Sequence, residues 1–176
     1  KDLPEVKITE KLCGIDFGYS NPCAVIDILV DSEGNYYIDH EWYHTGKTED
    51  EIGDYVSTRQ AHKVFPDPEN PSAVEVLRRK GVNVRDVIKG KGSIQTGIGI
   101  VREAFKQGRL KVNNSCVALL EELETYHYPE DKQDRNNDEN PVKENDHAMD
   151  AMRYVIMTHK PPKIISPQDR LTFYAN

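Results

Sequence analysis

The sequence predicts an α/β sandwich built around one mixed β-sheet. Three β-rich segments joined by short turns open the chain, and short apolar segments then alternate with helical ones. The length of 176 residues suits a single domain, and 37% apolar with 30% charged residues is an ordinary globular composition. No segment is apolar over the length that a bilayer requires, so no membrane partner is expected.

The first three strands are expected at residues 11–18, 23–31 and 36–43. Each is rich in β-branched or aromatic residues. Residues 32–35 read Ser-Glu-Gly-Asn, which is typical of a turn. Because short turns join neighbouring antiparallel strands, these three segments predict an antiparallel meander.

Helices and short strands alternate in the remainder of the chain. Thr48 is expected to cap a helix, because Glu51 completes a capping box three residues later. Pro71 is typical of a first helical turn, and Gly81 is typical of a helix end. The expected helices are 48–63, 71–80, 93–107, 115–126 with Ser115 as N-cap, and 148–159; the expected short strands are 64–65, 82–84, 87–88 and 110–112.

One domain is expected between residues 11 and 160. Residues 1–10 are interpreted as a linker remnant, because the chain opens without an initiator Met, and 161–176 as a proline-bearing tail. The polar segment 129–146 is expected to be an exposed loop or a protruding hairpin.

Three aspartates lie where the expected elements end or begin. Asp16 ends the first strand, Asp67 follows a short apolar pair, and Asp150 lies about one turn inside the last helix. His147 precedes Asp150 by three residues, so both share one helix face. Each of Asp16 and Asp67, considered separately, is also explained by a structural role in capping a turn. Asp146 is likewise explained by a role in capping the last helix. Asp150 lies among apolar neighbours and needs a partner or a metal ion.

Convergence of these side chains would create an oxygen-rich site with one imidazole. Such a donor set suits Mg²⁺ or Mn²⁺ better than structural zinc. Two such ions, about 3.5–4 Å apart, activate water and stabilise the leaving oxygen in phosphodiester hydrolysis. The residues therefore indicate a two-ion phosphodiesterase site.

The distribution of charge is uneven along the chain. A net charge of −7 alone disfavours a nucleic-acid partner. Residues 78–111, however, carry ten Lys or Arg residues and two acidic ones, a local charge of +8. This segment is either a solvated basic face or a DNA track beside an acidic metal site. The residues expected to contact DNA are Arg78, Arg79, Arg85, Lys89 and Lys91.

Three segments together resemble the nuclease domain of the large terminase subunit of tailed double-stranded DNA bacteriophages. Residues 14–22 (GIDFGYSNP) resemble its first nuclease motif, residues 67–72 (DPENPS) its second, and residues 145–154 (NDHAMDAMRY) its third, in the same order. The resemblance implies an RNase H-like fold with helices on both faces of the sheet. It also implies a Mg²⁺- or Mn²⁺-dependent endonuclease that cuts concatemeric viral DNA during genome packaging.

The resemblance assigns a role to each candidate side chain. Asp16 would bridge two metal ions, while Asp67 and Asp150 would each hold one. His147 would be a further ligand or a proton-transfer group, and Asp146 an optional ligand. The implied partners are double-stranded DNA, the packaging ATPase domain of the same polypeptide, the small terminase subunit and the portal protein. The resemblance also implies that the protein acts in the cytoplasm of the infected bacterium. The sequence holds no Gly-x-x-x-x-Gly-Lys-[Ser/Thr] phosphate loop, so the ATPase is expected outside it.

Other functions remain open at this stage. A catalytically silent nucleic-acid-binding or assembly module of the same fold would bind no divalent ion. An actin- or sugar-kinase-like ATPase would share the Asp-x-Gly sequence of residues 16–18, but it would need a second such loop and a longer chain. A Holliday-junction resolvase or a transposase-type nuclease would differ in the DNA structure that it cuts.

Overall fold

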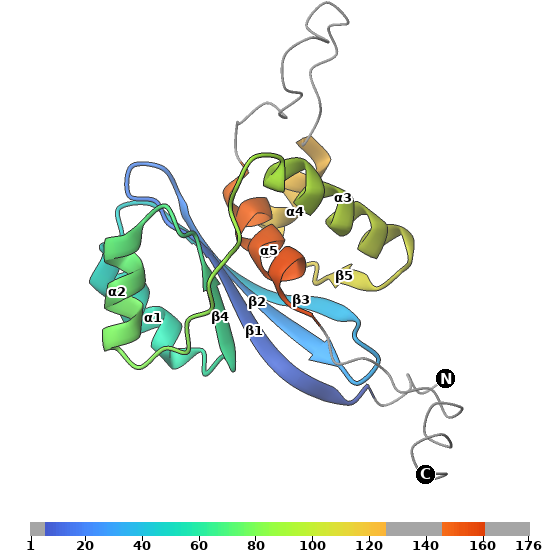
Figure 1. The fold of residues 1–176 in the computed structure, drawn as a ribbon, viewed down its shortest axis with the longest axis horizontal. Coiled ribbons are helices and arrows are strands. Elements are labelled where there is room, and N and C mark those ends of the chain that lie inside the picture. Colours follow the sequence, from blue (N-terminus) through green and yellow to red (C-terminus); the bar gives the residue numbers. More distant parts are fainter. Residues whose placement is uncertain (1–5, 126–145, 161–176) are drawn as a thin grey trace, which may run out of the picture.

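One mixed sheet forms the centre of the molecule. The computed structural model describes residues 6–125 and 146–160 (Figure 1). Five strands pair in the order β4-β1-β2-β3-β5. The first three strands are antiparallel, whereas β4 runs parallel to β1 and β5 parallel to β3, so the predicted mixed sheet is confirmed. The strands are β1 (Ile8–Asp16), β2 (Cys23–Asp31), β3 (Tyr36–His44), β4 (Lys63–Pro66) and β5 (Leu110–Val112).

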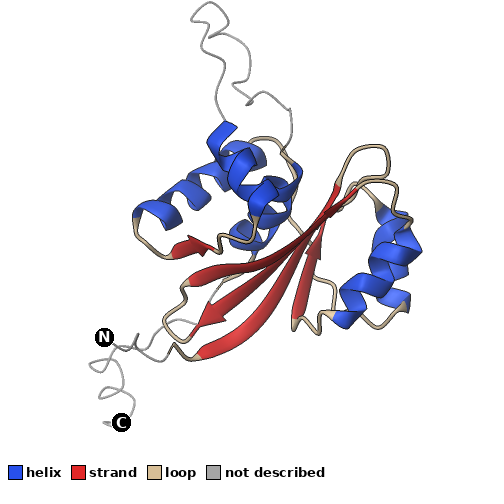
Figure 2. Ribbon diagram, turned by 180° about the vertical axis from the view of Figure 1, so that it is seen from behind, coloured by secondary structure: helices blue, strands red, loops and turns tan. Residues whose placement is uncertain are grey.

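Helices cover both faces of this sheet, as predicted. Two helices, α1 (Glu49–Thr58) and α2 (Pro71–Arg79), pack on one face. Three helices lie on the other: α3 (Ser93–Lys106), α4 (Val117–Thr125) and α5 (His147–Thr158). Figures 1 and 2 show the sheet between these two groups, with α5 against its central strands. No helix among the described residues is long and apolar enough to cross a membrane.

The side chains of β1 alternate between the two cores. Cys13 and Ile15 pack with α1 and α2, whereas Leu12 packs with α5. Because successive strand residues point to opposite faces, Gly14 and Asp16 lie on the α5 side with Leu12. The last residue of β1 therefore presents its carboxylate beside the start of α5.

Gly14 allows α5 to lie directly on β1. A Cβ atom at this position would collide with the carbonyl oxygen of Ala151 and would lie 2.9 Å from Cγ2 of Val155. Backbone therefore meets backbone here, which brings the first turn of α5 close to the end of β1.

Some expected elements differ from the structure. Helix α1 ends at Thr58 rather than 63, since Gln60 has a left-handed φ of 53° and the chain enters β4 at Lys63. The expected strands at 82–84 and 87–88 are wrong, because in this segment only Val84 pairs, in an isolated bridge to Val64. Strand β1 begins at Ile8, within the expected linker.

The expected cap of the fourth helix is also wrong. Helix α4 begins at Val117, so the N-cap position falls on Cys116 rather than Ser115. The carboxylate of Glu41 in β3 accepts hydrogen bonds from the N–H groups of Ala118 and Leu119, at 2.8 and 2.9 Å. A strand residue distant in sequence therefore accepts the hydrogen bonds of backbone N–H groups in the first turn of this helix. The expected polar loop lies outside the described residues except for its last residue.

Candidate active site

Two neighbouring strand ends place Asp16 and Asp67 at the same edge of the sheet. β1 and β4 are parallel, with Ile15 opposite Pro66. The N–H of Asp67 donates to the carbonyl oxygen of Ile15 at 2.9 Å. Both carboxylates therefore follow the carboxyl ends of parallel strands, where open α/β sheets commonly bind ligands.

The first turn of α5 adds a histidine and a third acid to these carboxylates. His147 Nδ1 lies 2.9 Å from Asp16 Oδ2, and this hydrogen bond raises the pKa of His147. Burial raises the pKa of Asp16 to about 6; the hydrogen bond from His147 opposes this, and the negative charges of Asp150 and Asp67 add to it. The four side chains singled out in the sequence thus lie in the same region of the molecule, with His147 in direct contact with Asp16.

Protein cations neutralise two of these acids. Lys89 Nζ lies 2.9 Å from Asp67 Oδ1, and Arg153 Nη2 lies 2.7 Å from Asp150 Oδ1. Both cations also lie over the ring of Tyr154, at 5.4 and 5.1 Å from its centroid. Each of the three acids therefore has a cationic or imidazole partner.

The donor chemistry of the site fits a hard divalent cation. Asp16, Asp67 and Asp150 offer carboxylate oxygens, and His147 offers one nitrogen, which is a set suited to Mg²⁺ or Mn²⁺. In the part of the chain that the structure describes, no three such side chains already converge closely enough to hold an ion. In this structure two of the acids are instead paired with Lys89 and Arg153.

A buried glutamate that the sequence analysis missed holds the start of α5. Glu122 is 4% exposed; its Oε2 accepts from the N–H of Met149 at 2.8 Å and its Oε1 from the hydroxyl of Tyr43 at 2.9 Å. Asp146 occupies the N-cap position of α5, but its side chain makes no capping hydrogen bond there. The Tyr43 ring also lies 6.4 Å from that of His147. The signal in the sequence was an acid on the apolar face of a helix.

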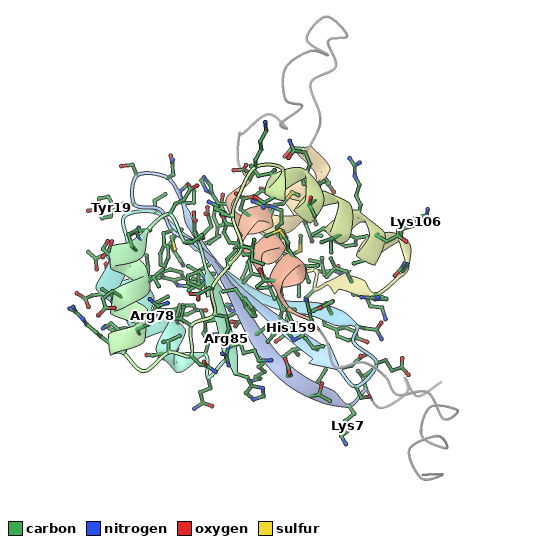
Figure 3. All side chains as sticks on the ribbon, in the orientation of Figure 1. Lys7, Tyr19, Arg78, Arg85, Lys106 and His159 are labelled. Atoms are coloured by element: carbon green, nitrogen blue, oxygen red, sulfur yellow. The ribbon has the colours of Figure 1, made fainter. Side chains whose placement is uncertain are left out.

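The basic residues expected to contact DNA lie on α2 and on the segment that connects α2 to α3. Lys89 lies within the site, and Lys91 is exposed two residues later. Helix α2 begins near Asp67 and ends with Arg78 and Arg79. The rise of the helix places these two arginines about 12 Å from its first residue. Figure 3 labels Arg78 and Arg85 on this side of the molecule, and both line a hollow of about 200 Å³ that also reaches Pro66 and Pro68 beside Asp67.

Residues 16–158 match the family model described as the terminase RNase H-like domain. The chain belongs to this family. It is 28% identical over 156 residues to the large terminase subunit of Escherichia phage T5, a match that covers 84% of this chain and 35% of that protein. The chain thus spans about a third of the length of this relative.

Solved structures confirm that the terminase domain described here has the RNase H-like fold. The large terminase nuclease domain of phage P22 superposes with a TM-score of 0.71 at 23% identity, covering 89% of this chain and 84% of that one. The large terminase nuclease domain of bacteriophage SPP1, which was solved with bound Mn, gives a TM-score of 0.67 at 20% identity, covering 83% of this chain and 84% of that one.

Proposed function

We propose that this chain is the nuclease domain of a phage large terminase subunit and that it cuts concatemeric viral DNA during packaging, with Mg²⁺ or Mn²⁺ as cofactor. The observation that carries this proposal is the position of Asp16, Asp67 and His147 at one edge of the sheet, with Asp150 near enough for its charge to raise the pKa of Asp16. The Mn-bound nuclease domain of phage SPP1 shares the fold and supports the choice of cofactor. Family membership disfavours the kinase-like alternative.

The position of each carboxylate suggests its task. Asp16 lies between β4 and α5 and is the residue proposed to be shared by two ions, with Asp67 holding one and Asp150 the other. When bound, such ions supply positive charge to the transition state at phosphorus and lower the pKa of water. Because burial raises the pKa of Asp16 to about 6, protons compete with a cation for this carboxylate in mildly acidic solution.

His147 is proposed to orient Asp16 and to handle a proton. In the neutral tautomer that donates from Nδ1 to Asp16, the Nε2 lone pair remains available. That nitrogen is suited either to binding an ion or to accepting a proton during hydrolysis. Asp146 stays an optional ligand, one residue before His147.

Double-stranded DNA is the proposed substrate. The exposed Lys91 and the arginines Arg78, Arg79 and Arg85 would contact phosphates along the α2 side of the molecule. The chain carries a net charge of −7, so its isolated affinity for DNA is expected to be weak and to fall steeply with salt. The packaging ATPase domain, the small subunit and the portal are proposed partners of the whole terminase, which would act in the cytoplasm of the infected host.

Cleavage of supercoiled plasmid tests this proposal directly. We expect the purified chain to nick and linearise plasmid with Mn²⁺ and to lose that activity on addition of EDTA. Asp16→Asn and Asp150→Asn should each remove cleavage, whereas Asp39→Asn, an exposed acid on β3, should not. Cleavage that survives Asp16→Asn would contradict the site. DNA binding without cleavage, together with no Mn²⁺ binding in calorimetry, would instead favour the catalytically silent module.

A further inference from the structure

A loop lysine lies within the acidic site, and we propose that Lys89 is the resident counter-ion of Asp67, which a divalent cation must displace. This inference rests on the proposed metal site. Residues 85–92 form neither helix nor strand and connect the Val84 bridge to α3. This segment carries Lys89 to the end of β4, where the second acid of the site lies.

The Lys89 ammonium occupies the position of a cation beside Asp67. Its Nζ lies 2.9 Å from Asp67 Oδ1 and 3.2 Å from Glu69 Oε2, and 5.4 Å from the ring centroid of Tyr154. The side chains of Lys89 and Asp67 are 23% and 15% exposed, so bulk water screens this pair only in part. Two carboxylates and an aromatic face thus surround one positive charge.

Lys89 is able to leave the site, in contrast to Arg153. Arg153 is 4% exposed, projects from within α5, and its stem packs against Gly97 of α3. Lys89 instead has exposed neighbours, since Ile88 is 74% exposed and Gly90 is exposed as well. Release of its flexible side chain requires movement of this loop alone, whereas release of Arg153 requires repacking of two helices.

A metal ion and the lysine ammonium exclude each other at Asp67. Two positive charges a few ångströms apart repel strongly where water screens them poorly. An ion held by Asp16 and Asp67 therefore binds only when the ion pair between Lys89 and Asp67 is broken. It follows that removing the ammonium tightens metal binding, and that binding of the metal exposes Lys89.

Calorimetric titration with Mn²⁺ tests the first consequence. Lys89→Met should bind Mn²⁺ about tenfold more tightly than the wild-type chain, equivalent to about 1.4 kcal/mol. Lys106→Met removes the same charge at an exposed position, the end of α3, and should bind as the wild type does. Equal or weaker binding by Lys89→Met overturns the inference. Wild-type binding that is absent, or that persists in Asp16→Asn, overturns the proposed function instead.

Acetylation of the wild-type chain tests the second consequence without any substitution at Lys89. We expect saturating Mn²⁺ to raise the acetylation rate of Lys89, measured by mass spectrometry, and to leave that of Lys91 unchanged. Asp67→Asn should raise the rate at Lys89 without metal, because its partner is lost. A Lys89 rate that stays constant while Mn²⁺ is bound shows that the lysine remains in place and overturns the inference.

Discussion

The carboxylate of Glu122 in α4 accepts a hydrogen bond from the backbone N–H of Met149 in α5, at 2.8 Å. Met149 lies between His147 and Asp150, so this bond fixes the turn that carries two of the candidate ligands. The second oxygen of Glu122 accepts from the hydroxyl of Tyr43, which ties the same turn to β3. Glu122 is therefore a positioning residue.

Truncation of this side chain should weaken both the fold and the site. Glu122→Ala leaves the N–H of Met149 and the hydroxyl of Tyr43 without their carboxylate partner, and we expect a loss of about 1–3 kcal/mol in the free energy of unfolding. Mn²⁺ affinity should fall as well, because the first turn of α5 loses its anchor. Urea unfolding and calorimetry measure the two effects. Glu121→Ala, at the exposed neighbouring position, should change neither.

The contact between Gly14 and α5 gives a second prediction. Gly14→Ala places a methyl group against the carbonyl oxygen of Ala151, and α5 has to move away from β1. We expect a loss of about 3 kcal/mol in the free energy of unfolding, at the upper end of the usual cost of overpacking. Gly99→Ala is the control: a Cβ there meets nothing within 4 Å, and helix propensity predicts a gain of about 0.5–1 kcal/mol. Equal effects of the two substitutions would contradict this account of the packing.

The sequence pointed to the acids of the candidate site but not to the groups that neutralise them in the structure. Asp16 and Asp67 follow short apolar segments, and His147 and Asp150 share a helical face; local patterns of this kind are readable along the chain. The partner of Asp67 is a lysine 22 residues away, on a loop that sequence analysis assigned to DNA contact. This ion pair forms because the segment after α2 runs back to the end of β4. The path of that segment depends on tertiary contacts, which local sequence propensities do not encode.

The same limit explains the errors in the fold. Residues 82–84 and 87–88 have the composition of strands, yet only Val84 bridges to β4. The chain then leaves the sheet edge and takes Lys89 to Asp67. Likewise Ser115 has the residue type of an N-cap, but Glu41 reaches α4 across 77 residues. In both cases a tertiary contact overrides a local preference that was correctly recognised.

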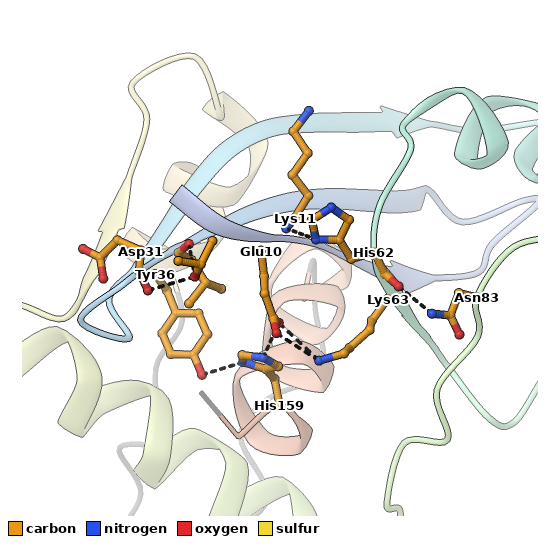
Figure 4. A network of polar contacts seen from close by, with 10 residues as sticks. Glu10, Lys11, Asp31, Tyr36, His62, Lys63, Asn83 and His159 are labelled. Carbon is orange, nitrogen blue, oxygen red and sulfur yellow. Dashed lines mark hydrogen bonds and ion pairs between the residues drawn. The ribbon is translucent and has the colours of Figure 1, made fainter. Parts of the chain in front are cut away.

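A buried histidine at the far end of α5 predicts how stability depends on pH. His159 is 6% exposed; its Nε2 lies 2.8 Å from Glu10 Oε2 and its Nδ1 3.0 Å from the hydroxyl of Tyr36, while Lys63 contacts the same glutamate (Figure 4). Burial lowers the pKa of His159 below 6.5, and the charge of Lys63 lowers it further, although Glu10 opposes both. The unfolded chain therefore takes up this proton at a higher pH than the folded chain does.

This difference sets the sign of the effect. The contribution of His159 to stability is complete above its unfolded pKa of 6.5 and declines as the pH falls below that value. We expect the urea midpoint of the wild type to fall relative to that of His159→Gln between pH 8 and pH 5. The comparison with the variant removes the contributions of Asp16 and His147, which are common to both chains. A constant difference between the two midpoints would contradict the prediction.

Metal binding should stabilise the folded chain, since the site exists only when β1, β4 and α5 are assembled. A ligand that binds only the folded state at 100 times its Kd adds about 2.7 kcal/mol to the free energy of unfolding. We expect Mn²⁺ to raise the Tm of the wild type and of Asp39→Asn, EDTA to reverse the shift, and Asp16→Asn to show none. A Tm that Mn²⁺ leaves unchanged, in a chain that still binds DNA, would identify the domain as a binding module rather than a nuclease.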